Sequence, residues 1–240
     1  MHRCLVSSIP DEGALLTLSE AEAQHALRVL RMKPGARVQL TDGKGALHWG
    51  ELMDDGRVKV LHPCEGTEPP IQLTLYQGLP KFDKLELIAQ KVTELGVTRI
   101  VPVRMSRCVV KLSAADGEKR RERLMRICQE AAKQCGRAQL PEVLAPVDYR
   151  DALDLMRMEQ LCLMAWEEAN GMNLSRMHEQ YPSAERIGLV IGPEGGISSQ
   201  EASSAQQAGA QHLTLGPRIL RTETAAIAAS AVIMNLWGDL

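Results

Sequence analysis

The sequence predicts an α/β protein in which a mostly parallel sheet, covered by helices on both faces, follows a small β-rich domain. From Ile71 onward, short apolar runs alternate with longer amphipathic segments, the pattern of β-α units. Before that point, short strand-like runs are separated by Asp-Gly turn signals. Between the two regions, residues 64–70 (CEGTEPP) carry two prolines and a glycine and are typical of a linker. We therefore expect domains at 1–70 and 71–240.

The first region is predicted to hold three strands and one helix. The strands cover residues 37–42, 46–53 and 57–62, where β-branched and apolar residues recur between turns. The helix covers 19–32, because Ser19 can cap it and apolar residues follow at helical spacing. Lys33-Pro34-Gly35 ends it.

The second region is predicted to alternate strands with helices. Strands are expected at 71–77, 99–103, 161–166, 187–191 and 212–215. Helices are expected at 81–95, at 118–135, from Ser198 onward, where Glu201 completes a capping box, and at about 223–237. Such alternation produces a parallel sheet through crossover connections.

Composition indicates a globular protein of the reducing cytoplasm. The 240 residues are 45% hydrophobic and 24% charged, and no run is long and apolar enough to span a bilayer. The start of the sequence lacks the pattern of a secretory signal. The six cysteines include no Cys-x-x-Cys pair and no histidine at ligand spacing, so we expect no metal site.

Basic residues gather in the middle of the chain. Residues 104–137 contain ten Lys or Arg and four Asp or Glu, although the whole chain has a formal charge of -2. Two interpretations fit equally well: a face that binds nucleic acid, or the solvated surface of a helix.

Two loops carry the residues most typical of a ligand site. Residues 192–199 (GPEGGISS) and 216–225 (GPRILRTETA) each follow a predicted strand, where open α/β sheets bind ligands. The first loop lacks the Gly-Lys-Ser/Thr of a phosphate loop, and Glu194 would repel phosphate. A neutral or cationic ligand, such as an adenosine that bears a sulfonium, fits better; a tight structural turn is the alternative.

The second loop adds two arginines at the start of a helix. Arg218 and Arg221 suit a developing oxyanion or a phosphodiester, although surface ion pairs are the other interpretation. We expect Thr222 to cap this helix and Glu223 to lie in its first turn, where a carboxylate suits the helix dipole.

These two loops resemble the signature loops of the 16S rRNA (uracil-1498-N3)-methyltransferase family of the SPOUT superfamily. Four other segments support the resemblance and extend it over nearly the whole chain: residues 25–35, 81–97, 106–112 and 130–143. The segment 148–186 resembles the family least.

The resemblance implies a PUA-like β-barrel over 1–70 and a SPOUT domain with a trefoil knot over 71–240. It also implies that S-adenosylmethionine binds to the two loops and that the protein is a homodimer. The helix from Thr224 onward, with Ile227, Ala231 and Met234 on one stripe, is the expected dimer element; a core helix within one subunit is the alternative. The implied cofactor contacts are Gly192, Pro193, Glu194, Gly195, Gly196, Leu215, Gly216, Ile219 and Leu220.

Methylation of uracil N3 requires removal of the imide proton, and an arginine near O2 or O4 would stabilise the anion. The predicted catalytic residues are Arg221, Arg218 and Glu194; Glu194 and Glu223 are both candidates to accept the proton or orient an arginine. The substrate would be 16S rRNA or the small ribosomal subunit. Predicted RNA contacts are Arg28 and Arg31 on the first helix, Lys84 and Lys91 on one face of the next, and Arg104 and Arg107.

Three other functions are weaker matches to the sequence. A Rossmann-type methyltransferase would need a glycine-rich loop after its first strand, and residues 76–84 (YQGLPKFDK) lack one. An enzyme acting on nucleotide phosphates is disfavoured because no loop lysine is present. A non-catalytic RNA-binding assembly factor would share the basic segment but would not need both glycine loops.

Overall fold

The computed structural model describes residues 2–169 and 172–240. It divides into two compact units: Met1–Glu68 with Gln129–Leu140, and Pro69–Cys128 with Pro141–Leu240. The boundary predicted at residue 70 lies beside the first of these divisions. The sequence did not predict that residues 129–140 belong to the first unit. They do because the longest helix, Ala114–Cys135, has its first part in the second unit and its last part in the first.

The first unit is built on a five-stranded sheet in the order β1-β3-β4-β5-β2. Its strands are β1 (Arg3–Leu5), β2 (Leu15–Leu16), β3 (Arg37–Thr41), β4 (Leu47–Leu52) and β5 (Val58–Pro63). Strand β1 pairs parallel to β3, and the other pairs are antiparallel. Val38, Leu40, Val58 and Val60 form its core, and all of their neighbours along the strands except Thr41 are exposed or half-buried, as strand periodicity predicts. The predicted strands are confirmed, whereas β1 and β2 were not predicted.

The helix of this unit is shorter than predicted. After Ser19, whose Oγ accepts the N–H of Glu22, helix α1 covers Glu20–Gln24 and continues as a π-helical turn, η1, over His25–Val29. Arg31 lies beyond both segments in the left-handed region, with φ 52°. The expectation that Arg28 and Arg31 share one helix is therefore wrong. A wider π turn shifts the side chains that follow it, which 3.6-residue spacing cannot anticipate.

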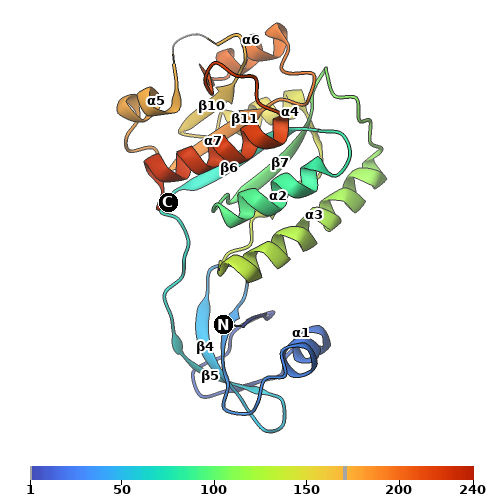
Figure 1. The fold of residues 1–240 in the computed structure, drawn as a ribbon, viewed down its shortest axis with the longest axis vertical. Coiled ribbons are helices and arrows are strands. Elements are labelled where there is room, and N and C mark those ends of the chain that lie inside the picture. The colour runs from blue at the N-terminus through green and yellow to red at the C-terminus, as the bar shows by residue number, and fades with distance from the viewer. Residues whose placement is uncertain (1, 170–171) are drawn as a thin grey trace. The chain divides into compact units, whose positions relative to one another are not determined.

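The second unit contains a seven-stranded parallel sheet in the order β12-β10-β11-β6-β7-β8, with β9 also paired to β7. Strands β6, β7, β10 and β11 of this sheet are labelled in Figure 1. Its strands are β6 (Gln72–Gly78), β7 (Arg99–Arg104), β8 (Glu142–Val143), β9 (Val147–Asp148), β10 (Leu161–Ala165), β11 (Arg186–Ile191) and β12 (Gln211–Leu213). The predicted strands and the parallel α/β class are confirmed. Strand β12 ends two residues earlier than expected, because Thr214 Oγ1 accepts the N–H of Gly216 and begins a turn.

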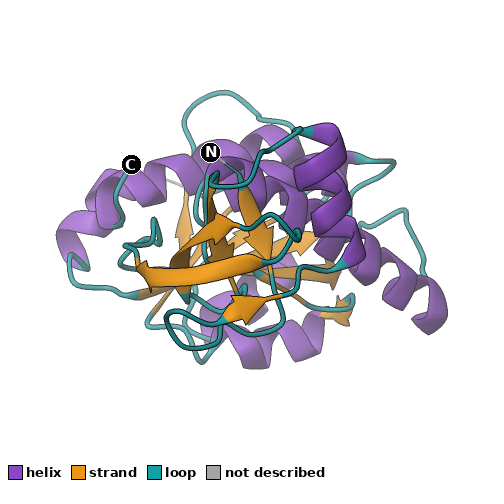
Figure 2. Cartoon of the chain, turned by 90° about the horizontal axis from the view of Figure 1, so that it is seen from below, coloured by secondary structure: helices purple, strands orange, loops and turns teal. Residues whose placement is uncertain are grey.

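Helices cover both faces of this sheet (Figure 2). They are α2 (Lys84–Glu94), α3 (Ala114–Cys135), α4 (Tyr149–Met156), α5 (Leu174–Gln180), α6 (Ser199–Gln207) and α7 (Thr222–Trp237). One core contains side chains of α2, α5, α7 and the first part of α3, and the other contains side chains of α4 and α6. Strand β11 contributes Leu189 to the first core and Val190 to the second, so its sequence shows no polar face.

The start of one helix, the face of another and the presence of two more differ from expectation. Helix α3 begins at Ala114 rather than 118, because Ser113 Oγ accepts the N–H of Asp116 and caps it. Helices α4 and α5 were not predicted at all. In α7, Met234 is fully buried in the core of its own chain, so it is not part of a dimer face. Within the described residues, no helix has the length and hydropathy needed to cross a membrane.

Candidate active site

The two glycine loops start side by side at the carboxyl edge of the sheet. Strand β10 lies between β11 and β12, and its last residue, Ala165, is paired with both Ile191 and Leu213. The loops that follow Ile191 and Leu213 therefore leave the sheet at the same level. This is the edge where parallel sheets bind their ligands.

A cavity of about 620 Å³ lies between the loops. Its volume is in the range of sites that bind small molecules and cofactors. The lining contains every residue predicted to contact the cofactor, together with Arg218, Arg221 and Lys84. The structure thus brings these residues together, and their individual roles remain predictions.

A buried chain of hydrogen bonds joins the first loop to the start of α7. Thr222 Oγ1 donates to the carbonyl of Gly192 at 2.7 Å and accepts from Gln77 Nε2 at 2.9 Å. Gln77, on the central strand β6, is fully buried, and Thr222 is 5% exposed. The helix cap is Arg221 rather than Thr222, which is the first helical residue. The predicted cap is therefore wrong, and the threonine hydroxyl instead links two loops.

Glycine at the end of β6 allows the first loop to approach closely. A Cβ atom at Gly78 would lie 2.6 Å from Pro193 Cδ and 2.7 Å from its backbone nitrogen. Contacts this short do not occur with any larger residue, so Pro193 can lie against the strand only because residue 78 is glycine.

Lys84 holds two carboxylates at one side of the cavity. Its Nζ atom is 3.1 Å from Glu194 Oε1 and 3.2 Å from Glu223 Oε2. The backbone N–H of Lys81 also donates to Glu194 at 3.0 Å. Burial acts to raise the pKa of Glu194, but hydrogen bonds from its own N–H and Lys81, with Lys84, lower it overall. The bond to Glu194 in turn raises the pKa of Lys84, so this pair is ionised.

One arginine near the cavity supports the first loop, and two others line the cavity itself. Arg107 Nη1 donates to the carbonyl of Gly195 at 3.1 Å. Arg218 and Arg221 line the cavity while remaining exposed to solvent. Two guanidinium groups are therefore available at the rim for an anion or a developing negative charge.

The other residues predicted to contact RNA lie away from the cavity lining. Lys91 pairs with Glu94 at 2.9 Å, and Arg104 pairs with Asp148 at 3.2 Å. Both ion pairs are surface interactions of small energetic value, which leaves the two cations able to exchange partners. Arg28 and Arg31 are exposed in the first unit.

Several residues of the cavity were missed in the sequence. Ala165, at the end of β10, lines it together with Trp166 and Glu167, which follow that strand, and Thr214 lines it after β12. The rule that ligands bind beyond strand ends could have identified the segment after β10, had that strand been given the same weight as its neighbours. Trp166 carries a buried indole N–H that has no hydrogen-bond partner among the described residues.

The fold and the cavity define an α/β domain with a cofactor-sized site made from two loops at the carboxyl edge of its sheet. A family model for an RNA methyltransferase domain matches residues 67–234, and one for an RNA methyltransferase PUA domain matches residues 18–59. The chain belongs to this family of RNA methyltransferases, and the expectation of a SPOUT-type domain preceded by a PUA-like domain is confirmed.

Individual relatives agree with this assignment over the full length. The chain is 33% identical to ribosomal RNA small subunit methyltransferase E of Bacillus subtilis, over 93% of this chain and 91% of the relative. The Mycobacterium tuberculosis protein of that name is 32% identical, over 97% and 92% of the two chains.

Two solved structures are also similar. A ribosomal RNA small subunit methyltransferase E from Neisseria gonorrhoeae, bound to S-adenosyl methionine, has a TM-score of 0.88 and 38% identity and covers 100% and 99% of the chains. A structure from Legionella pneumophila with bound S-adenosylmethionine has a TM-score of 0.86 and 33% identity and covers 99% and 98%.

Proposed function

We propose that the protein transfers a methyl group from S-adenosylmethionine to N3 of the uridine at position 1498 of 16S rRNA. The observation that carries this proposal is the cavity formed by both glycine loops, with two exposed arginines on its rim. Two similar structures contain S-adenosylmethionine, and the relatives are named for methylation of small-subunit rRNA. The N3 position and the nucleotide come from the resemblance of the two loops.

The residues of the cavity fit S-adenosylmethionine. Gly192, Gly195 and Gly196 expose backbone groups that can bind an adenine edge or the polar parts of the cofactor. Trp166 also lines the cavity, and its buried indole N–H has no hydrogen-bond partner among the described residues. Carboxylates at Glu194 and Glu167 suit a cationic sulfonium and an ammonium group rather than a phosphate. When bound, the cofactor supplies an electrophilic methyl group.

The protein's own contribution is to favour the anionic form of the uracil. N3 of a neutral imide is a poor nucleophile, so its proton must leave before or during attack. Arg221, supported by Arg218, would stabilise the negative charge that develops on the base oxygens. Glu194 is ionised and hydrogen-bonded, and its lowered pKa makes it a weak base that is better suited to orienting groups. Glu223 is the second candidate for accepting the proton.

RNA would be bound by exposed and half-buried basic residues of both units. Lys91, Arg104, Arg28 and Arg31 remain candidates for phosphate contacts. Lys84 and Arg107 hold carboxylates and the loop backbone, so we assign them a role in shaping the cavity. The target base would have to leave its stack to enter the cavity.

A cytoplasmic homodimer is part of the proposal. Because the buried face of α7 belongs to the core of its own chain, the dimer contact would use the opposite face. That face exposes Thr224, Ala228 and Val232, and side chains this short allow two helices to approach closely.

The test is methylation of small ribosomal subunits from cells that lack this gene. Subunits are incubated with the protein and labelled S-adenosylmethionine, and the modified nucleoside is identified by mass spectrometry. We expect labelled 3-methyluridine, lost with Arg221→Ala but retained with Arg157→Ala, a matched change at the end of α4 and outside the cavity. Label in another nucleoside would refute the N3 assignment. Subunit binding without any label would favour the assembly factor.

A further inference from the structure

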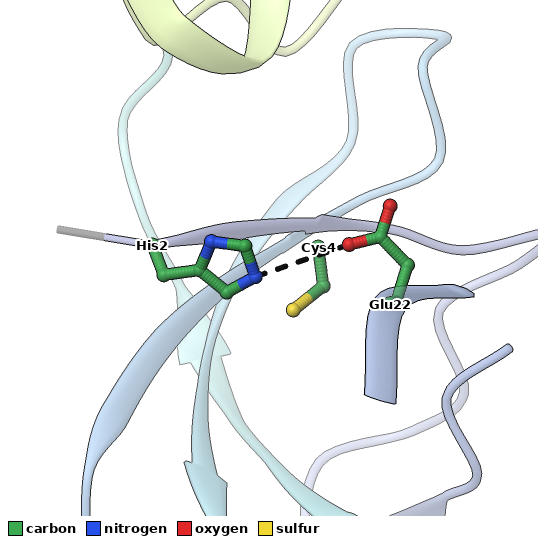
Figure 3. A group of neighbouring side chains, drawn as sticks. All are labelled: His2, Cys4 and Glu22. Carbon is green, nitrogen blue, oxygen red and sulfur yellow. Dashed lines mark ion pairs between the residues drawn. The ribbon is translucent and has the colours of Figure 1, made fainter. Parts of the chain in front are cut away.

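Three side chains of the types that bind transition metals lie together in the first unit (Figure 3). They are His2 and Cys4, at the start of the chain, and Glu22 of α1, and one ligand atom from each lies within 4.8 Å of the other two. The sequence predicted no metal site, because spacing along the chain reveals only local ligand pairs. Here the fold places α1 beside β1 and brings residues 2, 4 and 22 together.

Two polar atoms of this group lack ordinary partners. His2 Nε2 and Glu22 Oε2 are 3.9 Å apart, which is too far for a hydrogen bond. Both atoms are buried, and neither has a hydrogen-bond partner among the described residues. Buried nitrogen and oxygen atoms are nearly always partnered, so two such atoms that face each other indicate a missing ligand.

The separation of His2 and Glu22 is close to that of two zinc ligands. Two nitrogen or oxygen ligands at about 2.0–2.1 Å from a tetrahedral zinc ion lie roughly 3.4 Å apart. A contraction of about half an ångström would bring His2 and Glu22 to this separation. Imidazole nitrogen, thiolate sulfur and carboxylate oxygen are the three donor types that Zn²⁺ binds in proteins. The thiolate and carboxylate together neutralise the charge of the ion.

Lys133 contacts this group through an ion pair with the other oxygen of Glu22. The pair fixes the carboxylate so that Oε2 is directed at His2, as hydrogen bonds to metal-binding carboxylates do elsewhere. The positive charge of Lys133 opposes a metal ion, so binding depends on both the thiolate and the carboxylate.

We propose that His2, Cys4 and Glu22 bind a Zn²⁺ ion, which attaches the first strand to α1. Binding displaces the proton of the Cys4 thiol into solvent. Three protein ligands leave a fourth position for water or for His25, whose ring stacks on His2 with centroids 5.1 Å apart. The site is independent of the methyltransferase cavity, which lies in the second unit.

The experiment uses the full chain without a polyhistidine tag, expressed with zinc and analysed by elemental mass spectrometry. We expect about one zinc ion per chain, reduced at least tenfold in Cys4→Ser and His2→Gln. The matched control is Cys64→Ser, a thiol of the same unit outside the cluster, which should retain the metal. A His25→Ala variant that retains zinc identifies water as the fourth ligand, and one that loses it identifies the imidazole.

A second measurement needs no variant and so does not depend on variants that fold. The chain is depleted of metal and titrated with Co²⁺, whose thiolate complexes show a charge-transfer absorption. We expect that absorption to saturate at about one equivalent and to be displaced by Zn²⁺. Absence of both bound zinc and the absorption would overturn the proposal. Zinc that is retained by Cys4→Ser and His2→Gln would overturn it as well.

Discussion

Thr222 offers a direct test of how the two loops are held together. Replacement by valine keeps the shape of the side chain but removes the hydroxyl that bonds Gly192 and Gln77. Both interactions lie in or beside the core, and Gln77 is fully buried. Each bond contributes about 1 kcal/mol net, and a buried group left without its partner costs about 1–3 kcal/mol. Because Gly192 lines the cavity, water can replace one partner, and we expect a total loss of about 2 kcal/mol.

A loss of that size is measurable in two assays. The melting temperature of the second unit should fall by about 4–8 °C in thermal unfolding followed by circular dichroism. Affinity for S-adenosylmethionine, measured by calorimetry, should fall by about tenfold, since the carbonyl of Gly192 loses the group that orients it. Thr222→Ser is the control: it keeps the hydroxyl, loses one buried methyl worth about 1 kcal/mol, and should bind the cofactor normally. A valine variant that matches the wild type in both assays would refute the role of this link.

Three further changes test other parts of the structure. Phe82 is 81% exposed and has φ 56°, a left-handed backbone conformation that strains any residue except glycine. Phe82→Gly should therefore raise the free energy of unfolding, measured with urea, by about 1 kcal/mol. A free energy of unfolding below that of the wild type would contradict strain at this position. Burial acts to raise the pKa of Glu201, but hydrogen bonds from Ser198 and Ser106 lower it below 4.5. The ionised Glu201 therefore stabilises the fold above pH 4.5, and this stabilisation is lost as the pH falls through the lowered pKa. Glu201→Gln should therefore lower the melting temperature at neutral pH and make it fall less steeply as the pH is lowered. Melting temperatures of the two proteins that change in parallel with pH would contradict this. A Cβ at Gly195 would lie 2.9 Å from Arg107 Cβ, so Gly195→Ala should weaken cofactor binding at least about tenfold, whereas Gly66→Ala, whose Cβ meets only a contact at 3.9 Å, should not.

Predictions from the sequence succeeded where the deciding information is local. Strands that are buried on both faces appear as continuous apolar runs, and loops that must expose backbone require glycine. These two signals were enough to locate β11 and the cavity loops. Two-residue strands such as β8 and β9 contain no period to detect, so they were missed.

Other features were missed because the decisive partner is distant in sequence. Lys84 was predicted to contact RNA, and that role stays a prediction; in the fold its Nζ pairs with Glu194, 110 positions later, and with Glu223. Thr222 has the side chain of a helix cap, but its hydroxyl bonds to Gly192, 30 positions earlier. Local propensity describes what a residue can do, and tertiary packing selects among these possibilities.

These distant contacts imply that the positions of the two loops are coupled. Strand β6 precedes both loops in the sequence and lies next to β11 in the sheet. It supplies Gln77, which bonds Thr222, and Gly78, which makes room for Pro193. Lys84, in the helix that follows, joins the first loop to α7 a second time through Glu194 and Glu223. A change in either loop must therefore be transmitted to the other, because each loop is hydrogen-bonded or ion-paired through the same strand-to-helix segment. Cofactor affinity and the positions of Arg218 and Arg221 are thus expected to change together.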